Sequence, residues 1–300
     1  MGQLLEKRLV LGQDPEKNKK ERRKMKRQDI VNVLIERGFK AEMQENVKNG
    51  IIVEGIMIQG DDPIAPIIYT DRLIRDAEAQ GKSLEDVVAM VLRIYEENKH
   101  KGLDLGKIFD PEFIKSHVYL GLQKKSDEDL LKESCYLEGL EVYLYVREDS
   151  EHDGIYTMKV KKDFLERVGL DEKEVWECAR ANTSADTVVR TMAKVIAEMC
   201  GMSCDEISAD EPPMYVVSNK NCTRGASAVL DKKVLEDIGR KHGTDTLIIL
   251  PSSIHEVLVV PYEDGMDMDF MRSMVTEVNT TEVLPEDQLI SDAYKVTVTI

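Results

Sequence analysis

The last third of the chain alternates short runs of β-branched residues with helical patterns, and this order constrains the fold more than any other feature. The segments typical of strands are 214–218, 246–250, 254–260 and 294–300, and those typical of amphipathic helices are 232–242 and 267–278. The resulting order, βαββαβ, is the split pattern of ferredoxin-like domains. We therefore predict such a domain over residues 214–300, with both helices on one face of its sheet.

Residues 28–100 predict a helix, a three-stranded antiparallel sheet and helical structure after it. The first helix ends at Gly38, and Asn49-Gly50 is a typical hairpin turn between two strands. A third strand is expected near residues 65–69. The segment Ser83-Leu-Glu-Asp86 then forms the capping box of a further helix. These elements predict a separate α-β-β-β-α domain.

Residues 101–200 predict a mixed α+β region. Residues 113–122 are ambiguous between helix and strand, whereas 140–146 and 155–160 form a candidate hairpin. A helix capped by Asp171 follows, with Glu174 three positions later. A second helical stripe is predicted to be core, and it consists of Val188, Val189, Met192, Val195, Ile196 and Met199. The glycine, acidic and proline residues of 201–213 are typical of a linker.

Composition excludes several classes of protein. The chain has 300 residues, of which 42% are hydrophobic and 33% charged, and its formal net charge is −16. This balance predicts two or three globular domains of mixed α+β structure. No apolar run approaches the roughly 18 residues that cross a bilayer, and no signal-peptide pattern stands at the N-terminus. We therefore expect a cytoplasmic protein that does not bind membranes.

The five cysteines indicate neither a disulfide framework nor a metal site. Their number is odd, and Cys200 and Cys204 form the only close pair. That pair has no second pair and no histidine at the spacing of a zinc finger. We therefore expect reduced thiols, no metal and no cofactor.

Residues 1–27 form a basic N-terminal extension. They hold ten Lys or Arg and four Asp or Glu, a net charge of +6 that leaves −22 for the remaining residues. The cations that could bind nucleic-acid phosphates are Lys17, Lys19, Lys20, Arg22, Arg23, Lys24, Lys26 and Arg27. No aromatic side chain is interleaved with them to stack on bases, and the acidic remainder repels nucleic acid. A solvated arm or a frayed helix is therefore the favoured interpretation.

The densest cluster of potentially reactive side chains contains Ser252, Ser253, His255 and Glu256. If residues 254–260 form a central strand, His255 and Glu256 point to opposite faces near the edge of a core. The favoured interpretation is structural, with His255 hydrogen-bonded inside the fold and the two serines closing a turn.

Two chemical alternatives for this cluster stay open. In a hydrolase, His255 acts as general base, oriented by Glu256 or a distant aspartate, and Ser252 or Ser253 is the nucleophile. The chain has no Gly-x-Ser-x-Gly elbow, and its sequence places no oxyanion hole. In a metal site, His255-Glu256 starts a zincin-like motif, but the second histidine of that motif is missing.

Residues 215–227 predict a strand that runs into a polar turn. Such a turn can present backbone N–H groups to an anion, which makes Asn219, Asn221, Arg224 and Gly225 the candidate ligand-binding residues. The segment has a single glycine and matches no Gly-rich phosphate loop. Alternatively, the two asparagines are turn residues, and Gly225 is small because another segment packs against it.

Short motifs along the chain carry a resemblance. They are Ser83-Leu-Glu-Asp-Val-Val88, Ala179-Arg-Ala-Asn-Thr183, Tyr215-Val-Val-Ser-Asn219, Gly225-Ala-Ser227, Ile249-Leu-Pro-Ser-Ser-Ile-His-Glu256, Met274-Val-Thr-Glu-Val-Asn279 and Leu289-Ile-Ser-Asp292. Together they resemble a bacterial family known as domain of unknown function 5688, from about residue 28 to the C-terminus. The resemblance implies a protein of anaerobic Gram-positive bacteria, often encoded on mobile elements, and it supplies no catalytic role.

The chain departs from this family in two places. Family members begin near Met25, so residues 1–24 look like an extension, and Met25 is a possible alternative start. Ile290 stands where the family pattern has leucine. The first departure weakens any function that depends on the basic extension.

These observations favour a non-catalytic, macromolecule-binding or accessory protein, whose partner is another protein, of a mobile element or its host. The reason is that a large, well-patterned chain offers no convincing constellation of catalytic residues. The alternatives are the hydrolase centred on His255 and nucleic-acid binding through the basic extension. The most informative finding would be a pocket lined by both residues 215–227 and residues 250–256.

Overall fold

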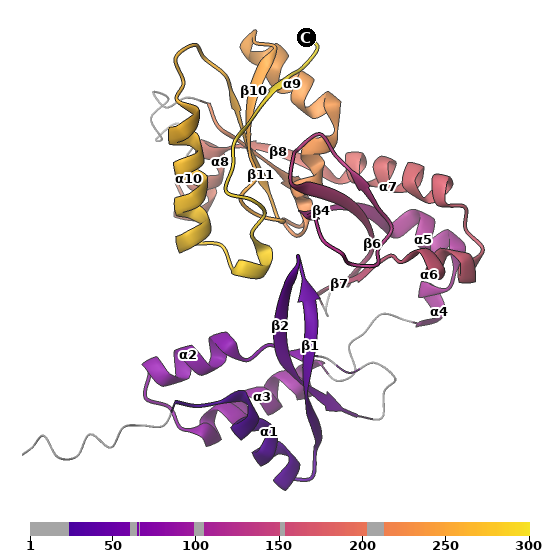
Figure 1. The fold of residues 1–300 in the computed structure, drawn as a ribbon, viewed down its shortest axis with the longest axis vertical. Coiled ribbons are helices and arrows are strands. Elements are labelled where there is room, and N and C mark those ends of the chain that lie inside the picture. Colours follow the sequence, from indigo (N-terminus) through magenta and orange to yellow (C-terminus); the bar gives the residue numbers. More distant parts are fainter. Residues whose placement is uncertain (1–23, 61–64, 66, 99–104, 151–153, 203–212) are drawn as a thin grey trace, which may run out of the picture. The chain divides into compact units, whose positions relative to one another are not determined.

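The structure, a computed structural model, describes residues 24–60, 65, 67–98, 105–150, 154–202 and 213–300 (Figure 1). By contacts the chain divides into two compact units. The first comprises Met1–Gln44 and Gly55–Glu96, and the second comprises Glu45–Glu54 and Glu97–Ile300. Helices and antiparallel sheets occur in both, so the predicted α+β class is confirmed. Most of the predicted basic extension and of the predicted linker lies outside the described residues.

The first unit follows the predicted order of a helix, three strands and helices. Its elements are α1 (Arg27–Glu36), β1 (Lys40–Lys48), β2 (Ile51–Gln59), β3 (Ile67–Ile68), α2 (Asp71–Ala79) and α3 (Leu84–Asn98). The sheet order is β1-β2-β3. Asn49 and Gly50 have φ angles of 51° and 75°, as a type I′ hairpin turn requires. This end of the hairpin, residues 45–54, is assigned to the second unit.

A single apolar core holds the first unit together. Ile30 and Leu34 of α1 are buried with Ile56 of β2 and Val87 of α3. The predicted capping box is present, because Asp86 N–H donates to Ser83 Oγ over 3.2 Å and Ser83 N–H donates to Asp86 Oδ2 over 2.8 Å. Helix α2 was not predicted, since its nine residues contain only a short apolar stripe.

The second unit contains two antiparallel sheets. The helices are α4 (Leu105–Ile108), α5 (Pro111–His117), α6 (Lys162–Val168), α7 (Glu172–Asp186), α8 (Met192–Cys200), α9 (Lys232–His242) and α10 (Met268–Thr281). The strands are β4 (Val118–Lys124), β5 (Lys132–Ser134), β6 (Leu140–Ser150), β7 (Gly154–Lys159), β8 (Thr187–Thr191), β9 (Tyr215–Asn219), β10 (Thr246–Leu250), β11 (Val257–Pro261) and β12 (Tyr294–Thr297). Two short 3₁₀ helices span Gly225–Leu230 and Pro285–Asp287.

The predicted βαββαβ order is present from β9 to β12. The five-stranded sheet has the order β12-β10-β11-β9-β8, so that β11 separates β9 from β10 as in a split βαβ unit. Strand β8 extends this sheet by pairing with β9. In the other sheet β6 pairs with β4, β5 and β7, which confirms the predicted hairpin of β6 and β7.

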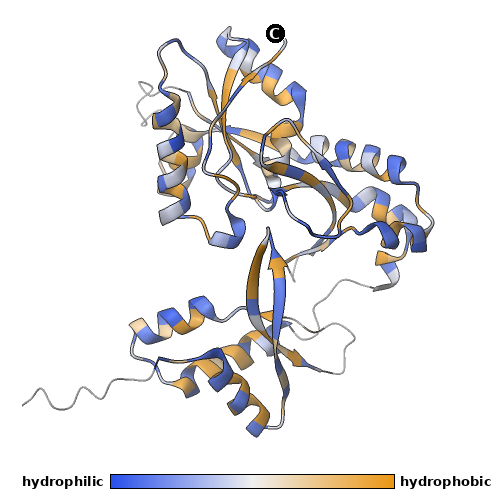
Figure 2. Cartoon of the chain, in the orientation of Figure 1, coloured by the Kyte–Doolittle hydropathy of each residue, from blue (hydrophilic) through white to orange (hydrophobic). Residues whose placement is uncertain are grey.

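The prediction that both helices of this domain lie on one face is wrong. Helix α9 packs through Leu235 into the core that contains Ile249 of β10, whereas α10 packs through Met271 and Val275 against Ile248. Figure 1 shows α9 and α10 on opposite sides of the sheet. The reason is that β10 and β11 are apolar on both faces, so each face needs a cover. In Figure 2 these strands are largely hydrophobic, and the helices alternate hydrophobic and hydrophilic bands.

Two further predictions from hydrophobic patterns are wrong. The stripe from Val188 to Met199 is not one core helix: its first part is the edge strand β8, and the side chain of Met199 in α8 is 82% exposed. The predicted strand over residues 254–260 begins only at Val257. The preceding backbone turns away because Ile254 N–H donates to the carbonyl of Asp287 over 2.9 Å.

The described part of the basic extension packs on the first unit. Arg27 Nη2 lies 2.6 Å from Asp71 Oδ1, and its Nε donates to Thr70 Oγ1 over 3.1 Å. These contacts hold Arg27 between α1 and α2. Over the residues that the structure describes, no helix combines the length and the apolar content that a membrane span requires.

Candidate functional site

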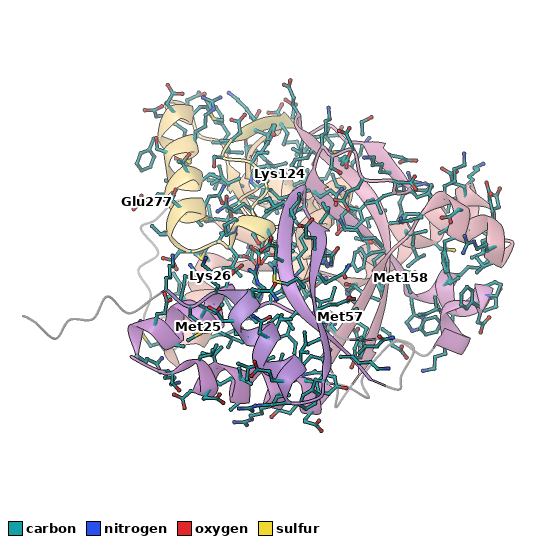
Figure 3. The ribbon with its side chains drawn as sticks, turned by 60° about the horizontal axis from the view of Figure 1, so that its bottom comes forward. Met25, Lys26, Met57, Lys124, Met158 and Glu277 are labelled. Atoms are coloured by element: carbon teal, nitrogen blue, oxygen red, sulfur yellow. The ribbon has the colours of Figure 1, made fainter. Side chains whose placement is uncertain are left out.

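The second unit contains a cleft of about 730 Å³. It is lined by the end of β4, the middle of β6 and β7, the loop 128–130, Arg224, Ile254 and the 3₁₀ turn that ends at Asp287, together with residues 45–49 of the same unit. Figure 3 labels Lys124 and Met158, the sequence neighbours of the cleft residues Gln123 and Lys159. The cleft therefore includes Arg224 from the segment 215–227 and Ile254 from the segment 250–256.

The floor of the cleft is fixed by an aromatic ring on a glycine. Tyr143 of β6 pairs with Gly121 of β4. A Cβ atom at Gly121 would lie 2.6 Å from Tyr143 Cε1 and 2.7 Å from its hydroxyl, so only glycine leaves room for the ring. Tyr143 is 1% exposed, and burial raises the pKa of its phenol. The hydroxyl is therefore protonated at neutral pH and is held at one position in the cleft.

Arg224 presents its guanidinium group to this hydroxyl. Its Nη1 donates to Tyr143 Oη over 2.8 Å. Burial lowers the pKa of Arg224, but its interactions with Tyr143, Tyr145 and Asp287 more than offset this and raise the pKa above its ordinary value. Among the described residues, no carboxylate lies within ion-pair distance of this guanidinium. Arg224 is thus a half-buried cation whose hydrogen-bonded neighbour is a neutral phenol.

The backbone of Arg224 is itself unusual. Its φ angle is +53°, in the left-handed region that non-glycine residues seldom adopt. Its N–H group donates to His255 Nδ1 over 3.3 Å, and Gly225 N–H donates to the carbonyl of His255 over 3.0 Å. The segment before β11 therefore holds Arg224 in this strained conformation.

Lys159 supplies a second cation, and that cation already has a partner. Its Nζ lies 2.6 Å from Glu128 Oε2 and donates to Gln123 Oε1 over 3.1 Å. It also lies 5.1 Å from the centre of the Tyr143 ring. Burial lowers the pKa of Lys159 below its ordinary value. Lys159 and Glu128 thus form one neutral pair at the side of the cleft.

His255 connects the arginine to an aspartate. Because its Nδ1 accepts the N–H of Arg224, the hydrogen-bond pattern assigns its proton to Nε2, which lies 3.5 Å from Asp287 Oδ2. Burial favours a raised pKa for Asp287, but the hydrogen bond and the charge of His255 hold it below its ordinary value. Sequence analysis named His255 but not Asp287.

The structure gives the two serines contacts within the turn. Ser253 Oγ accepts the N–H of His255 over 3.0 Å, and the carbonyl of Ser252 accepts the N–H of Leu289 over 3.0 Å. Both serines are buried. The prediction that His255 and Glu256 lie on a strand is wrong, since both precede β11. Burial raises the pKa of the Glu256 carboxyl above its ordinary value.

The turn before Arg224 uses its donors internally. Asn219 Oδ1 accepts the N–H of Thr223, and Asn219 Nδ2 donates to the carbonyl of Thr223 over 2.7 Å. Asn221 is exposed, and its carbonyl accepts the Thr223 hydroxyl. A Cβ atom at Gly225 would lie 2.5 Å from Ser218 Oγ, which confirms that Gly225 is small because of close packing. Arg224 is thus the candidate of this segment that lines the cleft.

Sequence reasoning missed the residues that surround Arg224. Gln123 and Tyr143 lie on strands whose alternation was recognisable, but nothing in the sequence pairs Tyr143 with an arginine 81 positions later. Asp287 follows a proline in a short 3₁₀ turn and carries no local signal. Within the described ranges, no three His, Cys, Asp or Glu side chains converge as they would to hold a metal ion.

Comparison with known proteins gives one match. No curated protein and no solved structure matches the chain. A sequence profile for a family of unknown function, DUF5688, matches residues 23–296. This span covers both units, including every described residue of the cleft named above. The chain therefore belongs to the DUF5688 family, as its motifs indicated.

Proposed function

We propose that this protein is a non-catalytic binding protein whose cleft takes an anionic group of a partner protein. The observation that carries the proposal is the guanidinium of Arg224, which faces the cleft beside the Tyr143 hydroxyl and has no carboxylate partner among the described residues. Guanidinium groups present several donors in a fixed plane, and carboxylates match that geometry. An anion that enters the cleft thus meets a preformed pair of donors.

The strained backbone of Arg224 supports the same function. A non-glycine residue with a φ of +53° costs folding free energy that glycine at this position would not. Strain of this kind gathers at binding and catalytic sites. Here the strain places a cation where it lines the cleft, which is a benefit that glycine would not supply.

A hydrolase centred on His255 is the second candidate, and one observation favours it. Asp287 stands where an orienting carboxylate is needed, with its Oδ2 3.5 Å from His255 Nε2. The opposite ring nitrogen, however, accepts the Arg224 N–H, and Ser253 Oγ accepts a backbone N–H. A general base must reach the proton that it removes, so this arrangement supports binding better than catalysis. Turnover of ester or amide substrates that is lost in Ser253→Ala would favour the hydrolase.

Nucleic-acid binding through the basic extension is a third candidate. It predicts retention on heparin that disappears when residues 1–24 are deleted. Retention that is unchanged by the deletion would exclude it. A role on a mobile element and a cytoplasmic location are expectations that belong to the same proposal.

The proposed function is tested by binding of a fluorescein-labelled octaglutamate peptide, measured by fluorescence anisotropy. We expect Arg224→Gln to weaken binding by about tenfold or more, because one charge-assisted contact contributes roughly 1.5–3 kcal/mol. The matched control is Arg240→Gln, which removes an exposed arginine that pairs with Asp237 on α9. Equal binding by the Arg224 variant and the wild type would overturn the proposal. Thermal unfolding of both variants checks that each is folded.

A further inference from the structure

The charges around Arg224 specify the ligand more closely than its sign. This inference rests on the proposed function. From residue 123 onward, the cleft lining carries three cations and four carboxylates: Lys159, Lys161, Arg224, Glu128, Asp129, Glu286 and Asp287. Lys159 pairs with Glu128, and Asp287 faces His255. Among the described residues, no ion pair involves Asp129 or Glu286, so two carboxylates are available beside the guanidinium.

We propose that the ligand is a peptide segment in which one glutamate or aspartate is flanked by lysine or arginine. Its carboxylate binds the guanidinium of Arg224 and the hydroxyl of Tyr143, and its flanking cations face Asp129 and Glu286. The segment belongs to a loop or an extended part of a basic partner protein.

A carboxylate fits this site better than a phosphate. A phosphate monoester carries nearly two negative charges at neutral pH and is normally bound by several cations or free backbone N–H groups. Here the N–H groups of Thr223, Arg224 and Gly225 all donate to acceptors within the fold. The carboxylates of the lining would repel a dianion, whereas a single negative charge is matched by one guanidinium.

Tyr143 adds a donor of the right kind. Its hydroxyl oxygen accepts from Arg224 Nη1 over 2.8 Å, so its own proton is free to donate to a second oxygen. A carboxylate placed here thus receives N–H bonds from the arginine and an O–H bond from the tyrosine. Because burial raises the pKa of Tyr143, that proton stays in place at neutral pH.

The remainder of the molecule favours a basic partner. Beyond residue 27 the chain carries a net charge of −22, which attracts a cationic protein and repels a purely acidic one. The cleft volume of about 730 Å³ is within the range that encloses small ligands, and it admits a few residues but no folded domain. A short mixed-charge segment satisfies both conditions.

Three labelled pentapeptides test the inference by fluorescence anisotropy: Gly-Lys-Glu-Lys-Gly, Gly-Gln-Glu-Gln-Gly and Gly-Lys-phosphoserine-Lys-Gly. We expect the first to bind about threefold to tenfold more tightly than the second, because each added ion pair contributes a fraction of a kcal/mol. We expect the phosphopeptide to bind more weakly than the first. Tighter binding of the phosphopeptide, or no measurable binding of any of the three, would overturn the inference.

Charge reversal in the cleft supplies the second arm. The double variant Asp129→Lys with Glu286→Lys should lose the preference for the lysine-flanked peptide and keep binding the glutamine-flanked one. The control, Asp264→Lys with Glu282→Lys, makes the same change in net charge at exposed positions outside the lining, and should keep the preference. Equal preference in the two double variants contradicts the inference.

The two proposals fail in different ways. If Arg224→Gln binds the octaglutamate peptide as the wild type does, the proposed function is wrong. If that variant loses binding but the flanking lysines give no advantage, the cleft is an anion site and only the mixed-charge ligand is wrong.

Discussion

The ring of Tyr143 covers Gly121 on the neighbouring strand, and this contact sets the position of the hydroxyl that Arg224 binds. A Cβ atom at Gly121 would lie 2.6 Å from Tyr143 Cε1, well inside the van der Waals distance. The glycine and the tyrosine therefore act as one structural unit, and the guanidinium depends on both.

The first prediction concerns that pair. We expect Gly121→Ala to lower the free energy of unfolding by about 1–3 kcal/mol, because the ring must move out of a packed interior. Urea unfolding measures the change. In a Tyr143→Ala background the same substitution should cost much less, since the obstructing ring is absent. An equal cost in both backgrounds would mean that the ring does not require the glycine.

A second prediction concerns Gly225. A Cβ atom there would lie 2.5 Å from Ser218 Oγ and 2.9 Å from the carbonyl oxygen of His255, and it would also meet the backbone nitrogen of Asn219. Backbone atoms cannot move aside as a flexible side chain can. We therefore expect Gly225→Ala to destabilise the protein more than Gly121→Ala does, in the same urea titration. A smaller loss would show that the loop relaxes.

Asp287 gives a prediction about acid. Its folded-state pKa is lowered, so the folded state binds a proton less readily than the unfolded state, and stability is lost as pH falls below the unfolded value of about 3.9. Asp287→Asn removes that contribution. Unfolding free energies measured between pH 6 and pH 2.5 should therefore fall less steeply in the variant. Parallel curves for the variant and the wild type would contradict the assignment.

Glu256 predicts the opposite sign. Burial raises its folded-state pKa, so the stability that it contributes is present below the unfolded pKa of about 4.3 and is lost as pH rises through the folded pKa. We expect Glu256→Gln to gain stability relative to the wild type as pH rises from about 4. The same urea series measures it. A gain that shrinks with rising pH would show that the carboxylate is stabilised rather than desolvated.

Much of the fold could be predicted because its signals are local. Strand β10 coincides with the predicted 246–250, and the cap is present, since Asp171 accepts the N–H of Glu174 as its sequence position indicated. The stripe from Val188 to Met199 misled because its apolar spacing continues across the junction between β8 and α8. Spacing alone does not show that an edge strand leaves one side without a cover.

The site could be predicted only in part, because its contacts are long-range. The polar turn that contains Arg224 was recognised, but its expected role, the offer of backbone N–H groups to an anion, passes to the side chain of one residue. The partners of that residue come from β6 and from the turn at Asp287, and only folding brings them together. The helix faces failed for the same reason: both sides of β10 are apolar, and no local pattern says which helix covers which side.

The distant origin of the cleft residues has a practical consequence. Tyr143, Arg224 and Asp287 belong to three segments that are neighbours only in the native chain, so an unfolded molecule has no equivalent surface. Whatever occupies the cleft therefore raises the melting temperature by mass action, whether or not its chemistry is known beforehand. A thermal-shift screen of peptide libraries, with Arg224→Gln as the counter-screen, can identify the physiological ligand of this family directly.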